Sequence, residues 1–243
     1  MGIVTPHLGL GLAPHVRACE SDGQVILLDL RNSRYLGIGR PQSCALADRV
    51  QGWPRSPGQA PECASSAQVS QLEASLLARG LLTDRPFNNL THAPVEVPTT
   101  SFDTDQHTVE TGIGAARLTR FLWTAAATSL RLRFRSLQAI VTTVQCRRDR
   151  GQVCPSTAGS LDEMKTGTAR YDRLRPFVFS ARENCLHDSL ALVDFLAAEG
   201  LFPQWVIGVK TRPFGAHSWV QAGSTVLNDQ HETVRQFRPI LVV

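Results

Sequence analysis

Short apolar runs separated by polar turns dominate the first part of the chain. Three of these runs have the length and composition of strands: residues 15–21 (HVRACES), 25–30 (VILLDL) and 35–39 (YLGIG). The pattern then changes to helical spacing over residues 43–52 and 68–79. In the second helix, four apolar side chains recur at that spacing: Val69, Leu72, Leu76 and Leu77. Residues 1–85 are therefore predicted to form a small α+β domain.

Residues 86–112 show neither the helical nor the strand period. They are polar and contain three prolines, which favours a linker. From residue 113 to about 147 apolar positions return with helical spacing throughout, and arginines occupy many of the positions between them. A second domain is therefore predicted over residues 113–243.

The end of the chain combines a helix with a run of strands. The helix carries Cys185 and ends at Gly200. Four strands are predicted after it: residues 205–210 (WVIGVK), 216–221 (AHSWVQ), 224–229 (STVLND) and 238–243 (RPILVV). A helix followed by an antiparallel meander makes the second domain α+β as well.

Composition narrows the possible function classes. A hydrophobic content of 42%, a charged content of 19% and a net charge of +4 are those of an ordinary globular protein. The six cysteines lack CxxC or zinc-finger spacing, so no metal is expected. The N-terminus does not have the pattern of a signal peptide, and the longest apolar stretch is about half a membrane span. We therefore expect a cytoplasmic protein with reduced thiols and no membrane partner.

Cys185 is the first candidate for chemistry, in the stretch ENCLHDS. Asn184 is a good N-cap residue, which would place Cys185 in the first turn of the helix. Ser180 and Glu183 also fit a capping box, which would start the helix four residues earlier. There the unpaired backbone N–H groups and the helix dipole stabilise a thiolate over a thiol. A cysteine that only packs in the core is the simpler interpretation. His187 is close in sequence, but residues two apart on a helix point in nearly opposite directions, so it is not expected to serve as the base.

His217 and Asp229 provide a better base and orienting acid. His217 lies in the strand AHSWVQ, and Asp229 ends the next predicted strand. If these two strands pair as a hairpin, the two side chains can face each other, and the carboxylate would orient the imidazole. Taken singly, each residue has an ordinary structural explanation. The ordered set of a cysteine at a helix start, then a histidine, then an aspartate indicates a nucleophile, a base and an acid.

Residues 185–229 resemble the protease part of the lasso peptide biosynthesis B proteins, a transglutaminase-like branch of the papain-like cysteine proteases. The resemblance rests on CL, SLAL, the GV strand, PFGAHSWV and VLND, with intervals of 32 residues from Cys185 to His217 and 12 from His217 to Asp229. It implies that these three residues form a catalytic triad. It also implies that the protein hydrolyses the leader–core bond of a lasso precursor peptide, after which an asparagine-synthetase-like cyclase closes the macrolactam ring.

The first domain resembles the PqqD-like, winged-helix-like domains that bind precursor leaders. The similarity implies that the leader adds a strand beside residues 34–39 and packs against the helix over 68–79. The contacts it implies are Tyr35, Leu36, Gly37, Ile38, Leu72 and Leu76. A generic winged-helix module that binds DNA is the alternative, although Glu73 makes that helix a poor surface for phosphates.

Two other functions remain open at this point. The same triad can transfer an acyl group to an amine, which would make the protein a transglutaminase or amide-forming enzyme. The arginine-rich residues 113–150 could instead bind nucleic acid, although a charged face of this kind is most often only solvated and can also bind an acidic partner. No GxxxxGK[ST] motif occurs, so no nucleotide cofactor is expected in this chain.

Overall fold

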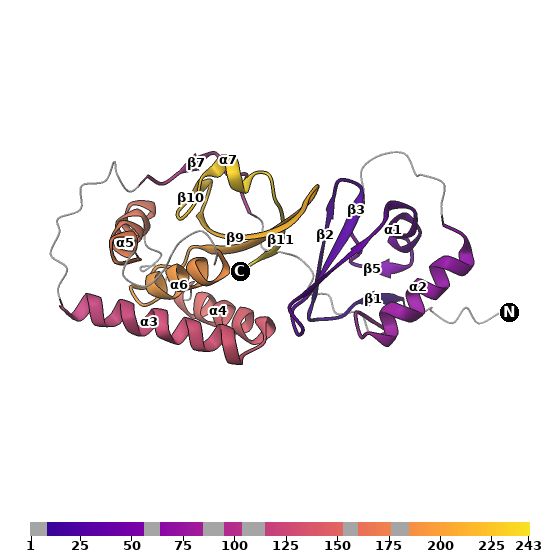
Figure 1. Ribbon diagram of the computed structural model, residues 1–243, viewed down its shortest axis with the longest axis horizontal. Helices are drawn as coiled ribbons and strands as arrows, with labels where there is room; N and C mark the ends of the chain where they lie inside the picture. Colours follow the sequence, from indigo (N-terminus) through magenta and orange to yellow (C-terminus); the bar gives the residue numbers. More distant parts are fainter. Residues whose placement is uncertain (1–8, 56–63, 85–94, 104–114, 153–159, 176–184) are drawn as a thin grey trace. The chain divides into compact units, whose positions relative to one another are not determined.

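The chain separates into two compact units, residues 1–91 and 92–243, in a computed structural model (Figure 1). The described residues are 9–55, 64–84, 95–103, 115–152, 160–175 and 185–243. Both units combine helices with antiparallel strands, so the prediction of an α+β protein is confirmed.

A three-stranded antiparallel meander forms one side of the first unit. Its strands are β2 (Val16–Ser21), β3 (Gln24–Asp29) and β4 (Arg34–Ile38), in that spatial order. Asp22 and Gly23 connect β2 to β3, and both have positive φ, which gives the tight hairpin turn that matches the twist of the strands. In the described part of the chain β4 pairs with β3 alone, so its other backbone edge carries no strand.

Two helices pack on this meander together with a second small sheet. The bounds are β1 (Leu10–Leu12), α1 (Arg40–Ala47), β5 (Val50–Gln51), α2 (Ser66–Ala78) and β6 (Leu82–Thr83). The first helix is shorter than the predicted 43–52, because the chain leaves the helix at Asp48 to pair β5 with β1. The core is apolar and includes Leu27, Leu46, Trp53 and Leu76. The PqqD-type assignment of this unit stays a prediction.

The second unit is built on a five-stranded sheet with the order β11-β8-β9-β10-β7. The bounds are β7 (Thr100–Ser101), β8 (Gln204–Thr211), β9 (Phe214–Ala222), β10 (Thr225–Val226) and β11 (Arg238–Val242). All neighbours are antiparallel except β7 and β10. The four strands predicted at the end of the chain are present, although β10 is shorter than predicted.

The prediction of a linker over residues 86–112 is wrong for residues 95–103. Thr100–Ser101 form β7 and Phe102 is buried, with its backbone N–H donating to Val226 O at 2.7 Å. A two-residue strand is too short to show a period-2 pattern, which explains why the sequence did not indicate it. The other residues of the predicted linker lie outside the described residues.

The described residues of the second unit contain five helices: α3 (Ala115–Phe134), α4 (Leu137–Gln152), α5 (Leu161–Leu174), α6 (Cys185–Ala197) and the short α7 (His231–Val234). α6 lies between α3 and the strands, in contact with both (Figure 1). Phe121, Tyr171 and Phe195 join α3, α5 and α6 through edge contacts, with ring centroids 5.5 to 6.3 Å apart. The sheet, α6 and α3 thus form successive layers, and the start of α6 meets the sheet.

Candidate active site

Cys185 is the first described residue of α6 and is half-buried. Its sulfur accepts hydrogen bonds from two backbone N–H groups, those of Leu186 on the same helix and Ser218 on β9. Both bonds, like the positive end of the helix dipole, favour the thiolate. Asn184, the predicted N-cap residue, lies outside the described residues.

His217 lies on β9 between Cys185 and Asp229. Its Nε2 is 2.6 Å from Oδ2 of Asp229, and its ring is also hydrogen-bonded to the Cys185 thiol. Because Asp229 occupies Nε2, the nitrogen that serves the sulfur is Nδ1. The antiparallel pairing of β9 with β10 brings the carboxylate to the ring, as the hairpin hypothesis expected. The three residues singled out from the sequence therefore meet in one place.

These contacts shift the pKa of all three groups toward an ion pair. The hydrogen bond with His217 lowers the pKa of the Cys185 thiol against the opposing effect of burial. Burial favours the neutral imidazole, but the hydrogen bonds to Asp229 and Cys185 outweigh it and raise the pKa of His217 to about 9. Burial also opposes the Asp229 carboxylate, yet its bonds to His217 and the Gln230 N–H lower its pKa. A thiolate beside an imidazolium is thereby favoured, which is the arrangement of an activated nucleophile.

Two aromatic rings hold the imidazole in position. Trp219 stacks with His217 at a centroid distance of 6.2 Å, and Phe237 lies at 5.2 Å. Gly208, which pairs with His217 across β8 and β9, makes room for both rings. A Cβ at Gly208 would lie 2.8 Å from the Trp219 ring and 2.9 Å from Cβ of Phe237. Neither Gly208 nor Phe237 was singled out from the sequence.

A buried polar network supports the residue next to Asp229. The carboxylate of Asp188, 4% exposed, accepts hydrogen bonds from Tyr171 Oη at 3.1 Å and from the Asn228 amide, and pairs with Arg175 at 3.0 Å. Asn228 Oδ1 in turn accepts from the backbone N–H of Val220 at 2.8 Å. Asn228 thus connects α6 to β9 and fixes the segment that presents Asp229. The sequence offered only the ND pair of VLND as a signal for it.

A second network joins α6 to β9 directly beneath Cys185. The hydroxyls of Ser189 and Ser218 are 2.7 Å apart, and the Trp205 indole N–H lies 3.1 and 2.9 Å from them. Ser189 is one helical turn after Cys185, so this contact fixes the start of the helix against the strand that carries His217. The sequence did not indicate these three residues, because nothing local distinguishes them from ordinary core residues.

His187 points away from the site, as the helix geometry predicted. Its Nε2 is 2.8 Å from the hydroxyl of Ser129 on α3. Burial lowers the pKa of His187, so the ring favours its neutral form. His187 is therefore a packing residue between α6 and α3.

The predicted leader contacts divide into two groups in the first unit. Tyr35 and Leu36 on β4 line a groove of about 220 Å³, together with Arg79 and Leu81 at the end of α2. Gly37 is exposed on the same strand, and Leu72 is partly buried. Ile38 and Leu76 are 4% and 0% exposed and belong to the core. Leu76 as a leader contact was wrong, because apolar spacing on a helix marks the face that the unit's own core covers. At Ile38 an added strand would meet the backbone of β4, so that contact stays a prediction.

Three further features of the residues that the structure describes concern metals, thiols and membranes. They contain no group of three or more His, Cys, Asp or Glu side chains placed to bind a metal. Their cysteines, Cys19, Cys44, Cys146 and Cys185, are free thiols. None of their helices is long and apolar enough to cross a membrane.

Residues 124–242 match the model of the family described as the transglutaminase-like superfamily. This part of the second unit is thus similar to transglutaminase-like proteins, and it contains Cys185, His217 and Asp229.

A more specific similarity covers a shorter stretch. Over 48 residues the chain is 44% identical to the microcin J25-processing protein McjB of Escherichia coli. The match covers 20% of this chain and 23% of McjB, so it spans about a quarter of that relative. No solved structure matches the chain.

Proposed function

We propose that this protein is a cytoplasmic cysteine peptidase that removes the leader from a lasso precursor peptide. The contact of His217 with both Cys185 and Asp229 is the observation that carries the proposal, because it joins a nucleophile, a base and an orienting acid. The transglutaminase-like domain and the similarity to a protein that processes microcin J25 support the reaction class and the substrate class.

In the proposed reaction the Cys185 thiolate attacks the carbonyl carbon of the last leader residue. The His217 imidazolium donates its proton to the departing amine of the core, which leaves an acyl-enzyme on the sulfur. The neutral imidazole then takes a proton from water, and the resulting hydroxide releases the leader as a carboxylate. Asp229 keeps the ring oriented and stabilises its charged form in both steps.

The first unit would capture the leader. The unpaired edge of β4 can accept an added strand through backbone hydrogen bonds, and the groove beside Tyr35 and Leu36 can receive a leader side chain. Arg79 and Asp29 also line that groove, so it offers charged groups as well as apolar surface. The freed core would pass to an asparagine-synthetase-like cyclase, which would supply any ATP-dependent chemistry.

Acyl transfer to an amine is the second candidate, and the family to which residues 124–242 are similar favours it. In that reaction an amine instead of water would resolve the acyl-enzyme. The triad geometry is the same for both reactions, so the product has to distinguish them.

Incubation of the protein with its precursor peptide in ¹⁸O water, followed by mass spectrometry, tests the proposal. Hydrolysis places one ¹⁸O atom in the new carboxylate of the leader and leaves a core with a free amine. An amine adduct without label would support acyl transfer. If the precursor stays uncleaved and neither product forms, both functions are contradicted.

A further inference from the structure

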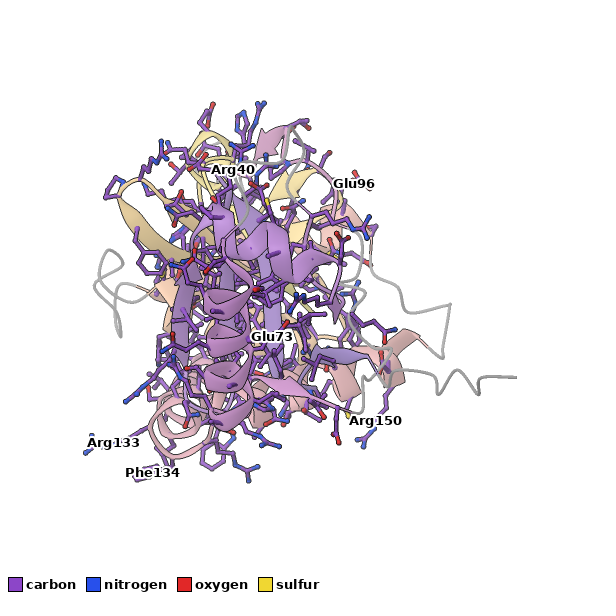
Figure 2. The ribbon with its side chains drawn as sticks, turned by 90° about the vertical axis from the view of Figure 1, so that its right-hand side faces the viewer. Arg40, Glu73, Glu96, Arg133, Phe134 and Arg150 are labelled. Atoms are coloured by element: carbon purple, nitrogen blue, oxygen red, sulfur yellow. The ribbon has the colours of Figure 1, made fainter. Side chains whose placement is uncertain are left out.

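α3 has apolar side chains on two opposite faces. Phe121 and Ala125 are buried on the face toward α6. On the opposite face lie four residues with helical spacing, here called the outer stripe: Trp123, Ala127, Leu130 and Phe134. The three large side chains of the stripe are 77%, 60% and 75% exposed, and Figure 2 shows Phe134 and its neighbour Arg133 pointing away from the ribbon. Packing within the unit does not account for this second face, since a helix at a protein surface normally turns polar residues to solvent.

A positively charged recess of about 480 Å³ adjoins the outer stripe. Trp123 and Ala127 line it on one side, and Arg131, Arg147 and Arg150 on another. At its floor the buried carboxylate of Asp194 pairs with both Arg131 and Arg147, the latter at 2.7 Å. One carboxylate therefore neutralises only one of two guanidinium groups, and Nη1 of Arg131 is buried without a hydrogen-bond partner. A buried donor of this kind is stabilised by an acceptor from outside.

The surrounding charge is strongly one-sided. Residues 115–152 contain eight arginines and a single acidic residue, Asp149. A surface of this charge attracts an acidic partner and disfavours a basic one. The structure thus provides an apolar ridge and a cationic hollow next to each other.

We propose that the outer stripe and the recess together dock an acidic amphipathic helix of a partner protein. Eleven residues separate Trp123 from Phe134, which is about 16 Å or three helical turns, the length that a partner helix covers with its own apolar face. A carboxylate of that helix would enter the recess and accept from Arg131 Nη1. The cationic groups lie in a hollow, where a protruding side chain fits better than the flat surface of a bilayer. The bearer of the helix, on the basis of the proposed function, is the cyclase that receives the cleaved core.

Binding of the full-length protein to the purified cyclase of the proposed function, measured by isothermal titration calorimetry, tests this surface. The variant Trp123→Ala/Leu130→Ala/Phe134→Ala should weaken binding by at least tenfold, and Arg150→Glu should weaken it severalfold. Leu161→Ala, which shortens an exposed apolar side chain on α5, is the matched control and should bind as the wild type. Leader release by the triple variant alone should be unchanged, because the stripe lies outside the triad.

Three results would overturn the docking proposal. The first is that the wild-type protein does not bind the cyclase. The second is that the triple variant binds it with wild-type affinity. The third is that the protein binds phosphatidylglycerol vesicles instead of the cyclase. The precursor assay decides the proposed function separately. Cleavage of the precursor without binding to the cyclase would support the peptidase function and contradict only the docking surface.

Discussion

The two units of the protein contrast in where they place polar side chains. In the described residues the first unit buries four polar side chains, His15, Ser21, Asp29 and Ser43, and leaves the edge of β4 open. The second unit contains most of the buried polar side chains, and several of them lie where α6 meets β9, among them Asp188, Ser189 and Ser218. Buried polar groups are tolerated only when they are hydrogen-bonded, and a bonded network fixes the positions of its members.

This difference fits the two tasks proposed for the units. Catalysis requires a sulfur, a ring nitrogen and a carboxylate held within tenths of an ångström, and a buried network provides that. Recognition of an extended peptide requires backbone groups that are still free to pair. Changes in the second unit are therefore expected to reduce turnover without changing leader affinity, and changes at β4 to do the reverse.

The largest effect is expected for Cys185→Ala. Removal of the nucleophile should lower leader release by at least about 10⁴-fold, because no other group can form the acyl-enzyme. The dissociation constant of a fluorescent leader peptide, measured by anisotropy, should stay within twofold of the wild-type value.

His187→Ala is the control for this variant, since His187 lies on the same helix but contacts Ser129. It should cleave at nearly the wild-type rate. Full activity of Cys185→Ala, or a loss in His187→Ala as large as the loss in Cys185→Ala, would contradict the assignment of the triad.

Asp229→Asn is expected to have the next largest effect, a loss in kcat of about 10²-fold or more. In the wild type, kcat/KM should fall as the pH rises through about 9, where His217 of the free enzyme loses the proton that it donates to the leaving amine. The carboxylate raises the pKa of that imidazolium, so its removal should move the alkaline limb to lower pH. A pH profile of kcat/KM measures this, and an unshifted alkaline limb would show that Asp229 does not tune His217.

Gly208→Ala should reduce kcat by about tenfold and leave KM nearly unchanged. The added methyl group would push Trp219 and Phe237 toward His217, because its carbon would lie less than 3 Å from the nearest atom of each side chain. Gly9→Ala is the matched control, since no atom lies within 4 Å of the added carbon there. Equal kcat values for the two variants would contradict a role of these rings in positioning His217.

The smallest effect is expected in the first unit. Tyr35→Ala removes a wall of the groove beside β4 and should weaken leader binding by about fivefold, with kcat at saturating precursor unchanged. Leu77→Ala on α2 removes a similar amount of exposed apolar surface outside that groove and should leave binding unchanged. Should both variants bind like the wild type, the leader would have to bind elsewhere.

Part of the fold and site could be read from local patterns. The meander of β2, β3 and β4 and the strands after α6 followed from alternation and turn residues. The helix within residues 160–175 was not predicted, although Ser160 and Glu163 form a capping box that starts α5. β7 and Phe102 were missed as well, because a strand of two residues takes its stability from the partner strand and leaves no periodic signal of its own.

The sequence by itself determined the chemical identity of the candidate triad. A cysteine at a helix start, a histidine on a strand and an aspartate after the next strand follow from order, spacing and periodicity, which are local properties of a chain. Only the tertiary structure decided the contacts: that His217 meets Cys185, that Asn228 and Ser218 fix them, and that Leu76 is covered while Trp123 is not. Those contacts depend on which faces pack together, and burial and distance between residues far apart in the chain arise only when the layers assemble.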